Sequence, residues 1–373
     1  MDFSLSDEQL LLRESVEKYV ADHGGVERHR QLSRTELGYD PAAWRAFAEL
    51  GWLALPFAEA DGGLGGGPTD LIVLCEALGR GLVREPYLHT AITCGGLLSA
   101  LADGSQRAEY LVSLMEGNVQ WAFAFAEEGG GYELAAPQCS AQASPDGFEL
   151  NGRKMAVFNG HTANQLLVTA RLDDDAFAVF LVDADSAGLS RESFSAVDGS
   201  RGADLQLAAV AVPKESCLAD GDKAVAAVES VLDRDIIALG AESVGAMQVL
   251  LDTTVEYSKT REQFGQPIGK FQALQDRMAD MYLKLEETRS LLYNAAILLE
   301  EGDAAAPAAC AALKVKLGEA GRFISHEAVQ VHGGIGMTDE MIVSHLFKRL
   351  LLLAKLYGDD AYHLDRYLRL SPA

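Results

Sequence analysis

The spacing of apolar residues changes twice along this chain, and this feature constrains the fold more than any other. Over residues 1–118 apolar side chains recur at helical spacing. Over 119–220 they fall in short runs of period two, and over 221–373 long helical patterns return. We take these changes as domain boundaries, which predicts a helical domain, a β domain and a second helical domain.

Local signals refine this division. Ser6 and Gln9 stand at the spacing of a capping box at the start of the first helix. Asn151-Gly152 lies between two strand-like runs and predicts a β-hairpin turn there. The last domain contains four long helical patterns, expected to form an antiparallel bundle, over residues 225–258, 271–301, 305–331 and 340–369.

The charge balance excludes some classes of partner. The chain has 31 Lys and Arg against 55 Asp and Glu, a formal net charge of −24. Nucleic acid requires a basic footprint, so we expect no nucleic-acid partner, and docking on an anionic membrane is disfavoured for the same reason. An anionic ligand would therefore have to meet a few local cations.

The start of the sequence has no basic segment followed by an apolar one, so we expect no secretory signal. Apolar runs such as 350–354 are far shorter than the ~18 residues of a membrane span. The five cysteines are scattered and form no CxxC pair, which disfavours a disulfide framework or a zinc site. A cytoplasmic location is expected.

Two glycine-rich segments, 61–67 and 128–131, carry neither the GK[ST] of a P-loop nor a GxGxxG pattern, and we interpret each as a loop. His326 and His332 are at the wrong spacing for a helix with two metal ligands, which places them at i and i+4. No metal is therefore expected.

The segment Arg261 to Gln272 is more specific. It holds an arginine, two phenylalanines and several amides around a Gly/Pro break between two helical patterns. Arginine forms forked bonds to phosphate and a phenyl ring offers a flat face, so this segment is suited to a phosphorylated aromatic ligand. An ordinary turn with a surface arginine has the same composition.

The segment Gln330 to Thr338 is the second such element. Glycines at 333, 334 and 336 let the backbone approach a ligand closely, and Gln330 has both a donor and an acceptor. A helix C-cap followed by a turn also places glycine just past a helix end. The residues alone leave both interpretations open.

Together these two segments make the chain resemble the acyl-CoA dehydrogenase family along essentially its whole length. The resemblance implies an α+β multidomain fold, with an N-terminal helical domain (1–118), a central β-barrel-like domain (119–220) and a C-terminal four-helix bundle (221–373). In that family the two segments bind the ADP part of FAD across a subunit interface. The matching positions here are Arg261, Phe264, Gln272, Gln330, Gly333 and Gly334.

The resemblance also implies a reaction. A carboxylate removes the α-proton of an acyl-CoA thioester, and hydride passes from the β-carbon to the flavin, giving the trans-2-enoyl-CoA. Electrons then leave to an electron-transferring flavoprotein. The weakly acidic α-proton requires a desolvated carboxylate within reach and donors that hold the enolate charge.

The central domain departs from the family pattern. Ala126 stands where a threonine bonds the flavin, and Tyr132 where a serine lies near the substrate. Ala156 replaces a tryptophan that shields the flavin, and Phe158 replaces a threonine that bonds it. The usual pocket for the isoalloxazine ring is expected to be degraded.

The catalytic base is also changed. Gly358 takes the place of the glutamate that most members use. Some members use a glutamate early in the first long C-terminal helix, and Asp235 corresponds to it, so Asp235 is the candidate base. Glu242 follows two turns later on the same face, Asp359 and Asp360 are weaker candidates, and any of these carboxylates would also suit a solvated surface.

These losses resemble the small, degenerate subunits of heteromeric members from steroid, bile-acid or dicarboxylate catabolism. We expect the chain to be half of an α2β2 tetramer with a homologous subunit, with a self-sufficient homo-oligomer as the other possibility. A non-catalytic subunit that completes the FAD site of an active partner is the alternative function. Altered flavin chemistry, such as a monooxygenase or nitroalkane oxidase, is a third. The acyl group cannot be read from the sequence.

Overall fold

The computed structural model describes residues 5–133 and 136–371. Contacts divide the chain into two units that interleave along the sequence. Unit 1 comprises Met1–Leu32, Gly67–Val83 and Ile236–Ala373, and unit 2 comprises Ser33–Gly66 and Arg84–Asp235. The three domain boundaries expected from the sequence stay a prediction.

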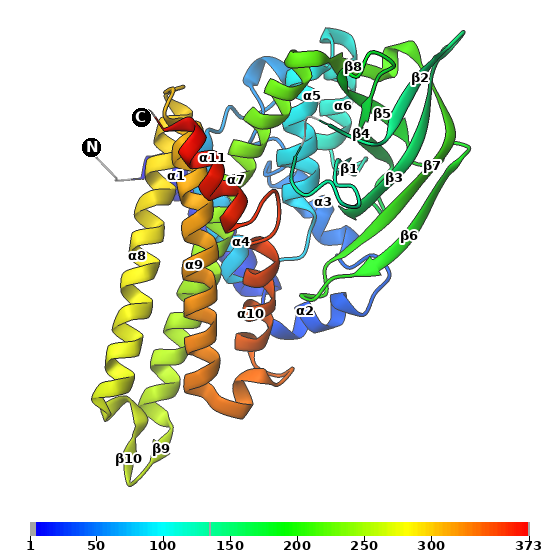
Figure 1. Cartoon of the computed structure of the whole chain (residues 1–373). Helices are drawn as coiled ribbons and strands as arrows, with labels where there is room; N and C mark the ends of the chain where they lie inside the picture. The colour runs from blue at the N-terminus through cyan, green and yellow to red at the C-terminus, as the bar shows by residue number, and fades with distance from the viewer. Residues whose placement is uncertain (1–4, 134–135, 372–373) are drawn as a thin grey trace. The chain divides into compact units, whose positions relative to one another are not determined.

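Unit 1 is helical (Figure 1). The cap on its first helix is confirmed, because Ser6 Oγ accepts from Gln9 N at 3.2 Å and Gln9 Oε1 accepts from Ser6 N at 3.1 Å. Its helices are α1 (Asp7–His23), α2 (Val26–Ser33), α4 (Pro68–Arg80), the larger part of α7 (Gly221–Thr260), η4 (Ile268–Lys270), α8 (Gln272–Glu300), α9 (Ala306–His332), η5 (Gly333–Met337), α10 (Ile342–Leu353) and α11 (Asp360–Leu370).

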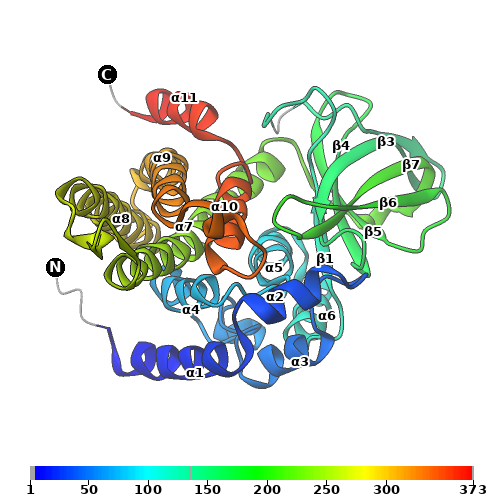
Figure 2. The same ribbon diagram turned by 90° about the horizontal axis from the view of Figure 1, so that it is seen from below.

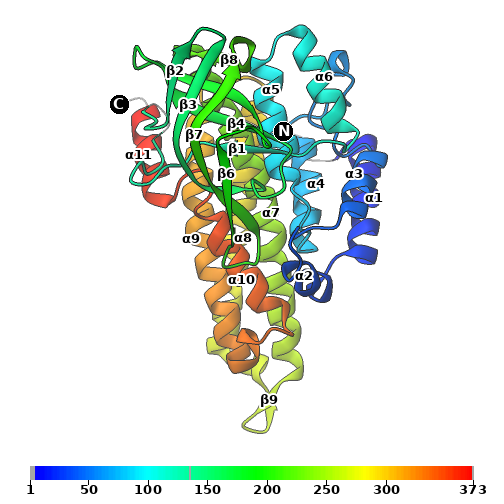
Figure 3. The same ribbon diagram turned by 90° about the vertical axis from the view of Figure 1, so that its right-hand side faces the viewer.

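Three of the four helices expected in the bundle are confirmed as single long helices, since α7, α8 and α9 run side by side in Figures 1 and 3. The expectation of a single fourth helix over 340–369 is wrong, because that segment is broken into α10 and α11. Tyr357 (φ 57°) and Gly358 (φ 116°) lie in the break. Left-handed backbone cannot continue a right-handed helix, so the chain changes direction there.

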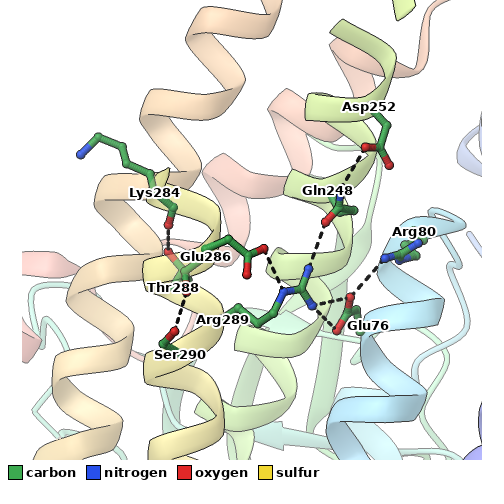
Figure 4. A network of polar contacts seen from close by, with 9 residues as sticks. All are labelled: Glu76, Arg80, Gln248, Asp252, Lys284, Glu286, Thr288, Arg289 and Ser290. Atoms are coloured by element: carbon green, nitrogen blue, oxygen red, sulfur yellow. Dashed lines mark hydrogen bonds and ion pairs between the residues drawn. The ribbon is translucent and has the colours of Figure 1, made fainter. Parts of the chain in front are cut away.

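A polar network ties α4, α7 and α8 together within unit 1 (Figure 4). Arg289 Nη1 donates to both carboxylate oxygens of Glu76, at 2.8 and 2.9 Å, and its Nη2 donates to Gln248 Oε1 at 3.1 Å. The helices approach closely at this level, because a Cβ added at Gly245 of α7 would lie 2.1 Å from the Glu76 carbonyl oxygen. Glycine is what permits this α4–α7 crossing.

Unit 2 is built on an eight-stranded sheet, which curls in the view of Figure 2. The strand order is β6-β7-β3-β2-β4-β5-β8, and β1 pairs in parallel with β4. The strands are β1 (Trp121–Ala124), β2 (Ser140–Ser144), β3 (Gly147–Phe158), β4 (Gln165–Arg171), β5 (Phe177–Asp183), β6 (Leu189–Ser195), β7 (Arg201–Pro213) and β8 (Cys217–Asp220). Its helices are α3 (Pro41–Glu49), η1 (Glu59–Asp61), η2 (Leu88–Cys94), α5 (Gly95–Leu101), α6 (Gly104–Met115) and η3 (Lys214–Ser216).

The runs of period two form β3, β4, β5 and β7, as expected, and they enclose an apolar core that includes Leu150, Phe180 and Leu205. The hairpin turn expected at Asn151-Gly152 is wrong, because both residues lie inside β3. The β2–β3 turn instead follows Ser144, which pairs with Gly147. Gly152 allows the backbone of β3 to pass close to Cys139, since a Cβ at Gly152 would lie 2.7 Å from Cys139 Cα.

The helix α7 is long and apolar enough to cross a membrane by length and composition alone, with a mean hydropathy of 1.3 over its best 18-residue window. Of that window, 72% is buried inside the fold. Core packing therefore accounts for its apolar character.

Candidate functional site

A short hairpin between α7 and α8 carries three of the residues predicted to bind the cofactor. Its strands are β9 (Glu262–Gln263) and β10 (Gln266–Pro267), joined by Phe264 (φ 53°) and Gly265 (φ 79°), as a tight hairpin turn requires. The Phe264 ring is 93% exposed, and Arg261 and Gln272 are exposed at the two ends of the segment. Such a phenyl ring adds nothing to the core of this chain, so it is available to a ligand or to another chain.

The other three predicted residues lie where α9 ends. Gln330 is exposed, and Gly333 has φ 63° and ψ −143°, a conformation suited to glycine. Gly334 has no such constraint, and a Cβ added there would meet nothing within 4 Å. The fold of the described chain therefore does not require glycine at 334, and the backbone there is open to a ligand.

The structure brings the two segments to one end of unit 1, because the β9–β10 hairpin and the end of α9 lie together in Figures 1 and 3. Arg261 forms no ion pair with any residue in the described part of the chain. A cation, an exposed ring and an open glycine turn at one place are suited to a phosphorylated aromatic ligand.

The positions in unit 2 that the resemblance assigns to the isoalloxazine ring offer few hydrogen-bonding groups to a ligand. The Ala126 carbonyl accepts from Met155 N at 2.8 Å, and Ala156 N donates to Asp204 Oδ1 at 2.9 Å. Ala156 sits at an irregular point in the β3–β7 pairing, with φ 51°. Neither alanine has a side chain that could form a hydrogen bond.

The ring of Phe158 is already engaged within unit 2. It stacks on His89, with ring centroids 5.5 Å apart and an angle of 11°, and meets the edge of Phe194 at 5.8 Å. A phenyl group cannot replace the hydrogen bond that a threonine hydroxyl makes. The residues expected around the isoalloxazine ring therefore do not fit that group. Sequence reasoning missed the His89 contact, for which no motif exists.

Asp235, the candidate base, is fully buried in unit 2. Thr93 Oγ1 lies 3.0 Å from Asp235 Oδ2 and 3.0 Å from the Leu88 carbonyl oxygen. A hydroxyl has one hydrogen and can satisfy only one of these acceptors, whereas a protonated Asp235 supplies a second. Burial raises the pKa of Asp235 well above its usual range, and Oδ1 has no hydrogen-bond partner among the described residues. Burial and the unpaired Oδ1 both favour the neutral form of this carboxyl.

Asp235→Asn is expected to raise the free energy of unfolding at about pH 7.5, because wild-type folding must protonate this carboxyl and the amide removes that cost. A raised folded pKa contributes stability that is present in acid and lost as the pH rises. The gain is therefore roughly 1.4 kcal/mol per unit of pKa difference, and it vanishes near pH ~4. Urea unfolding of both proteins across this range measures it. A variant no more stable than wild type at neutral pH would show that Asp235 is ionised.

The other carboxylates are committed to partners in unit 1. Glu242 binds Arg349 through both oxygens, at 2.6 and 3.0 Å, and both side chains are largely buried. Asp359 caps α11 by accepting from Tyr362 N, and the hydrogen bond from Lys355 is the first cause that lowers its pKa. A carboxylate with a lowered pKa is a weak base.

The turn at the family's base position leaves no room for a side chain. A Cβ at Gly358 would lie 2.4 Å from His363 Nε2 and 2.6 Å from Tyr362 Cδ1. Lys314, which is 1% exposed, donates to the carbonyl oxygens of Gly358 at 2.7 Å and Ala354 at 2.9 Å, and burial lowers its pKa to about 7. Sequence reasoning did not single out Lys314, because nothing local marks a lysine in an apolar helix face as a cap for a distant turn.

Three family models match this chain in the order of its segments. They are the acyl-CoA dehydrogenase N-terminal domain over residues 6–118, the middle domain over 122–210 and the C-terminal domain over 225–369. Together these matches give the three-domain architecture of a family of oxidoreductases, with helical domains before and after a sheet domain in the sequence. The chain belongs to the acyl-CoA dehydrogenase family.

Individual relatives align with this chain over nearly its whole length. Mitochondrial isovaleryl-CoA dehydrogenase of Arabidopsis thaliana is 31% identical, over 94% of this chain and 87% of that protein. A variant of the Tcur3481-Tcur3483 steroid ACAD aligns with a TM-score of 0.89 and 32% identity, covering 98% of both chains. The ChsE4-ChsE5 complex from Mycobacterium tuberculosis aligns with a TM-score of 0.91 and 27% identity, covering 100% of both.

Proposed function

We propose that this chain is one subunit of a heteromeric acyl-CoA dehydrogenase, and that it completes the FAD site of a homologous partner that carries the catalytic base. The observation that carries this proposal is the turn at Gly358, where the packing of Tyr362 and His363 excludes any side chain. The burial of Asp235 supports it, because a carboxyl that is 0% exposed offers no accessible oxygen to the α-carbon of a substrate. Of the two functions expected from the sequence, the geometry favours the non-catalytic subunit.

FAD is the cofactor of the family, and in this proposal the chain contributes residues to its ADP half. Arg261, Gln330 and the open backbone at Gly333 and Gly334 would hold the ADP half, with Phe264 and Gln272 beside it. Arginine gives charge-assisted bonds to a diphosphate, and a glycine turn lets its amides approach. When bound, the flavin accepts a hydride from the acyl thioester.

The isoalloxazine half does not fit this chain, for the reasons given at Ala126, Ala156 and Phe158. The partner subunit is therefore the source of the ring pocket and the base in an α2β2 assembly. Acyl-CoA as substrate, the trans-2-enoyl-CoA as product, an electron-transferring flavoprotein as acceptor and a cytoplasmic location belong to the same proposal. Heteromeric relatives such as the ChsE4-ChsE5 complex support it.

The test is expression of the chain alone and with a homologous subunit that has the glutamate turn. Alone, the chain is expected to bind no FAD; together, the pair binds FAD and oxidises an acyl-CoA. Arg261→Ala in the pair should weaken FAD binding about tenfold to a hundredfold, the range for hydrogen bonds to a charged group. Lys259→Ala is the matched control, because Lys259 is an exposed cation two residues away that pairs with Glu256.

Two results would contradict the proposal. One is a chain that purifies alone with a full complement of FAD and is reduced by an acyl-CoA. The other is loss of α-proton exchange in Asp235→Asn, which would make Asp235 the base of a self-sufficient enzyme. Equal FAD affinity in Arg261→Ala and Lys259→Ala would remove this hairpin from the cofactor site.

A further inference from the structure

The two segments proposed to hold the ADP half of the cofactor come from distant parts of the sequence. A contact between two rings joins the helix ends from which they extend. Tyr257 of α7 stacks on His332 of α9, with ring centroids 4.4 Å apart and planes at 24°. Tyr257 lies one helical turn before Arg261, and its carbonyl oxygen accepts from Arg261 N at 2.8 Å. His332 directly precedes Gly333. The stack therefore sits at the base of both segments.

His332 is held firmly in place. Its side chain is buried, and its Nδ1 donates to the Ala328 carbonyl oxygen at 2.8 Å, which sets the tautomer. The turn also folds back over this residue, because a Cβ at Gly336 would lie 2.8 Å from His332 Cβ. The glycine turn therefore packs directly against the Cβ of His332, next to the ring that stacks on Tyr257.

Hydrophobic packing alone does not account for a histidine here. Its Nε2 is buried and has no hydrogen-bond partner among the described residues. A leucine would fill similar space without leaving a buried nitrogen unpaired, which has an energetic cost. What the histidine adds is a flat face toward Tyr257 and a bond to its own helix. Both features orient the ring.

The hairpin is tied to Tyr257 as firmly as the glycine turn is to His332. Ile268 N donates to the Arg261 carbonyl oxygen at 2.8 Å and closes the base of the hairpin. Gly269 packs against the end of α7, since a Cβ there would lie 2.8 Å from Ser258 Oγ. These contacts, with the bond from Arg261 N to the Tyr257 carbonyl oxygen, join the hairpin to the end of α7 that carries Tyr257.

We propose that Tyr257 and His332 are a positioning pair, which sets the separation between the Arg261 hairpin and the Gly333-Gly334 turn and thereby the affinity for the diphosphate of FAD. The inference rests on the proposed function, since it assumes that these segments bind the ADP half. Neither ring touches the cofactor in this proposal. Their effect passes through the backbone of the two segments.

The experiment has one arm that needs no cofactor. Hydrogen exchange of the free chain is measured by mass spectrometry for Tyr257→Leu, which removes the stack, and Tyr257→Phe, which keeps it. Tyr257→Leu is expected to speed exchange in both the 261–269 and the 333–337 segments, although only the first adjoins the substituted residue. Tyr257→Phe should match wild type. Faster exchange confined to 261–269 in Tyr257→Leu would overturn the inference.

The second arm measures FAD affinity in the assembled pair of subunits. Tyr257→Leu should weaken FAD binding about threefold to tenfold, the range for losing an aromatic pair, and Tyr257→Phe should restore it. Leu285→Ala is the control, because this α8 residue is fully buried and lies outside both segments, so its truncation destabilises unit 1 without altering either motif. If Leu285→Ala weakens FAD binding as much as Tyr257→Leu does, or if neither variant weakens it, the pair has a structural role only. If Arg261→Ala is also without effect, it is the proposed function that fails, and the exchange arm still decides whether the rings couple the segments.

Discussion

Replacing Gly245 with alanine is expected to destabilise unit 1 by roughly 3 kcal/mol or more, although alanine is the better helix former. The added methyl group would lie 2.1 Å from the Glu76 carbonyl oxygen and 3.1 Å from Arg80 N. Both are backbone atoms of α4 and cannot rotate away, so the helices must separate. That movement also breaks the two bonds from Arg289 to Glu76.

The matched control is Gly321→Ala, the same change in the interior of α9. A Cβ there meets only Leu350 side-chain atoms at 3.6 and 3.7 Å, which is ordinary contact. With no clash, the helix propensity of alanine should stabilise the chain by about 0.5 to 1 kcal/mol. Urea unfolding of the two variants is thus expected to give changes of opposite sign. Two stabilising changes would mean that α4 and α7 are not as close as described.

The sequence predicted the elements of this fold better than their ends. Period alone located β3, β4, β5 and β7 and the helices α7 to α9, because burial of one face dominates in long elements. The sequence analysis did not predict the helix break at Gly358, because it depends on the left-handed backbone of Tyr357, and a tyrosine side chain does not indicate that conformation. The Asn151-Gly152 signal failed because tertiary contact with Cys139, not a turn, requires the glycine.

The cofactor residues could be predicted because they form two continuous motifs. The β9–β10 hairpin and the end of α9, which carry the two motifs, lie together at one end of the bundle. The Tyr257 and His332 stack could not be found, since it depends on the relative position of two helices rather than on spacing within either. Whether these residues bind FAD stays a prediction.

Lys154→Met is expected to destabilise unit 2 by about 3 to 5 kcal/mol, the cost of breaking a buried ion pair by removing one partner. The Lys154 side chain is 0% exposed, and its Nζ lies 2.6 Å from Glu127 Oε1 and 2.8 Å from Thr169 Oγ1. Burial lowers the pKa of Lys154, and methionine fills similar space without charge. The variant would therefore leave the Glu127 carboxylate, 6% exposed, without its cation.

Two further variants separate charge from packing. Lys154→Met combined with Glu127→Gln removes both charges, so it should recover part of the loss, because neutralising a stranded carboxylate is favourable. Arg153→Met is the matched control, because Arg153 is the next residue along the strand but its side chain is 46% exposed. It pairs with Asp204 at 3.1 Å, and exposed pairs contribute at most about 1 kcal/mol. Urea unfolding of the four proteins forms the comparison. Glu127 also accepts hydrogen bonds from two backbone amides, Gln138 N and, at 3.0 Å, Cys139 N. A double variant less stable than Lys154→Met would show that Glu127 is held by these amides rather than by the lysine.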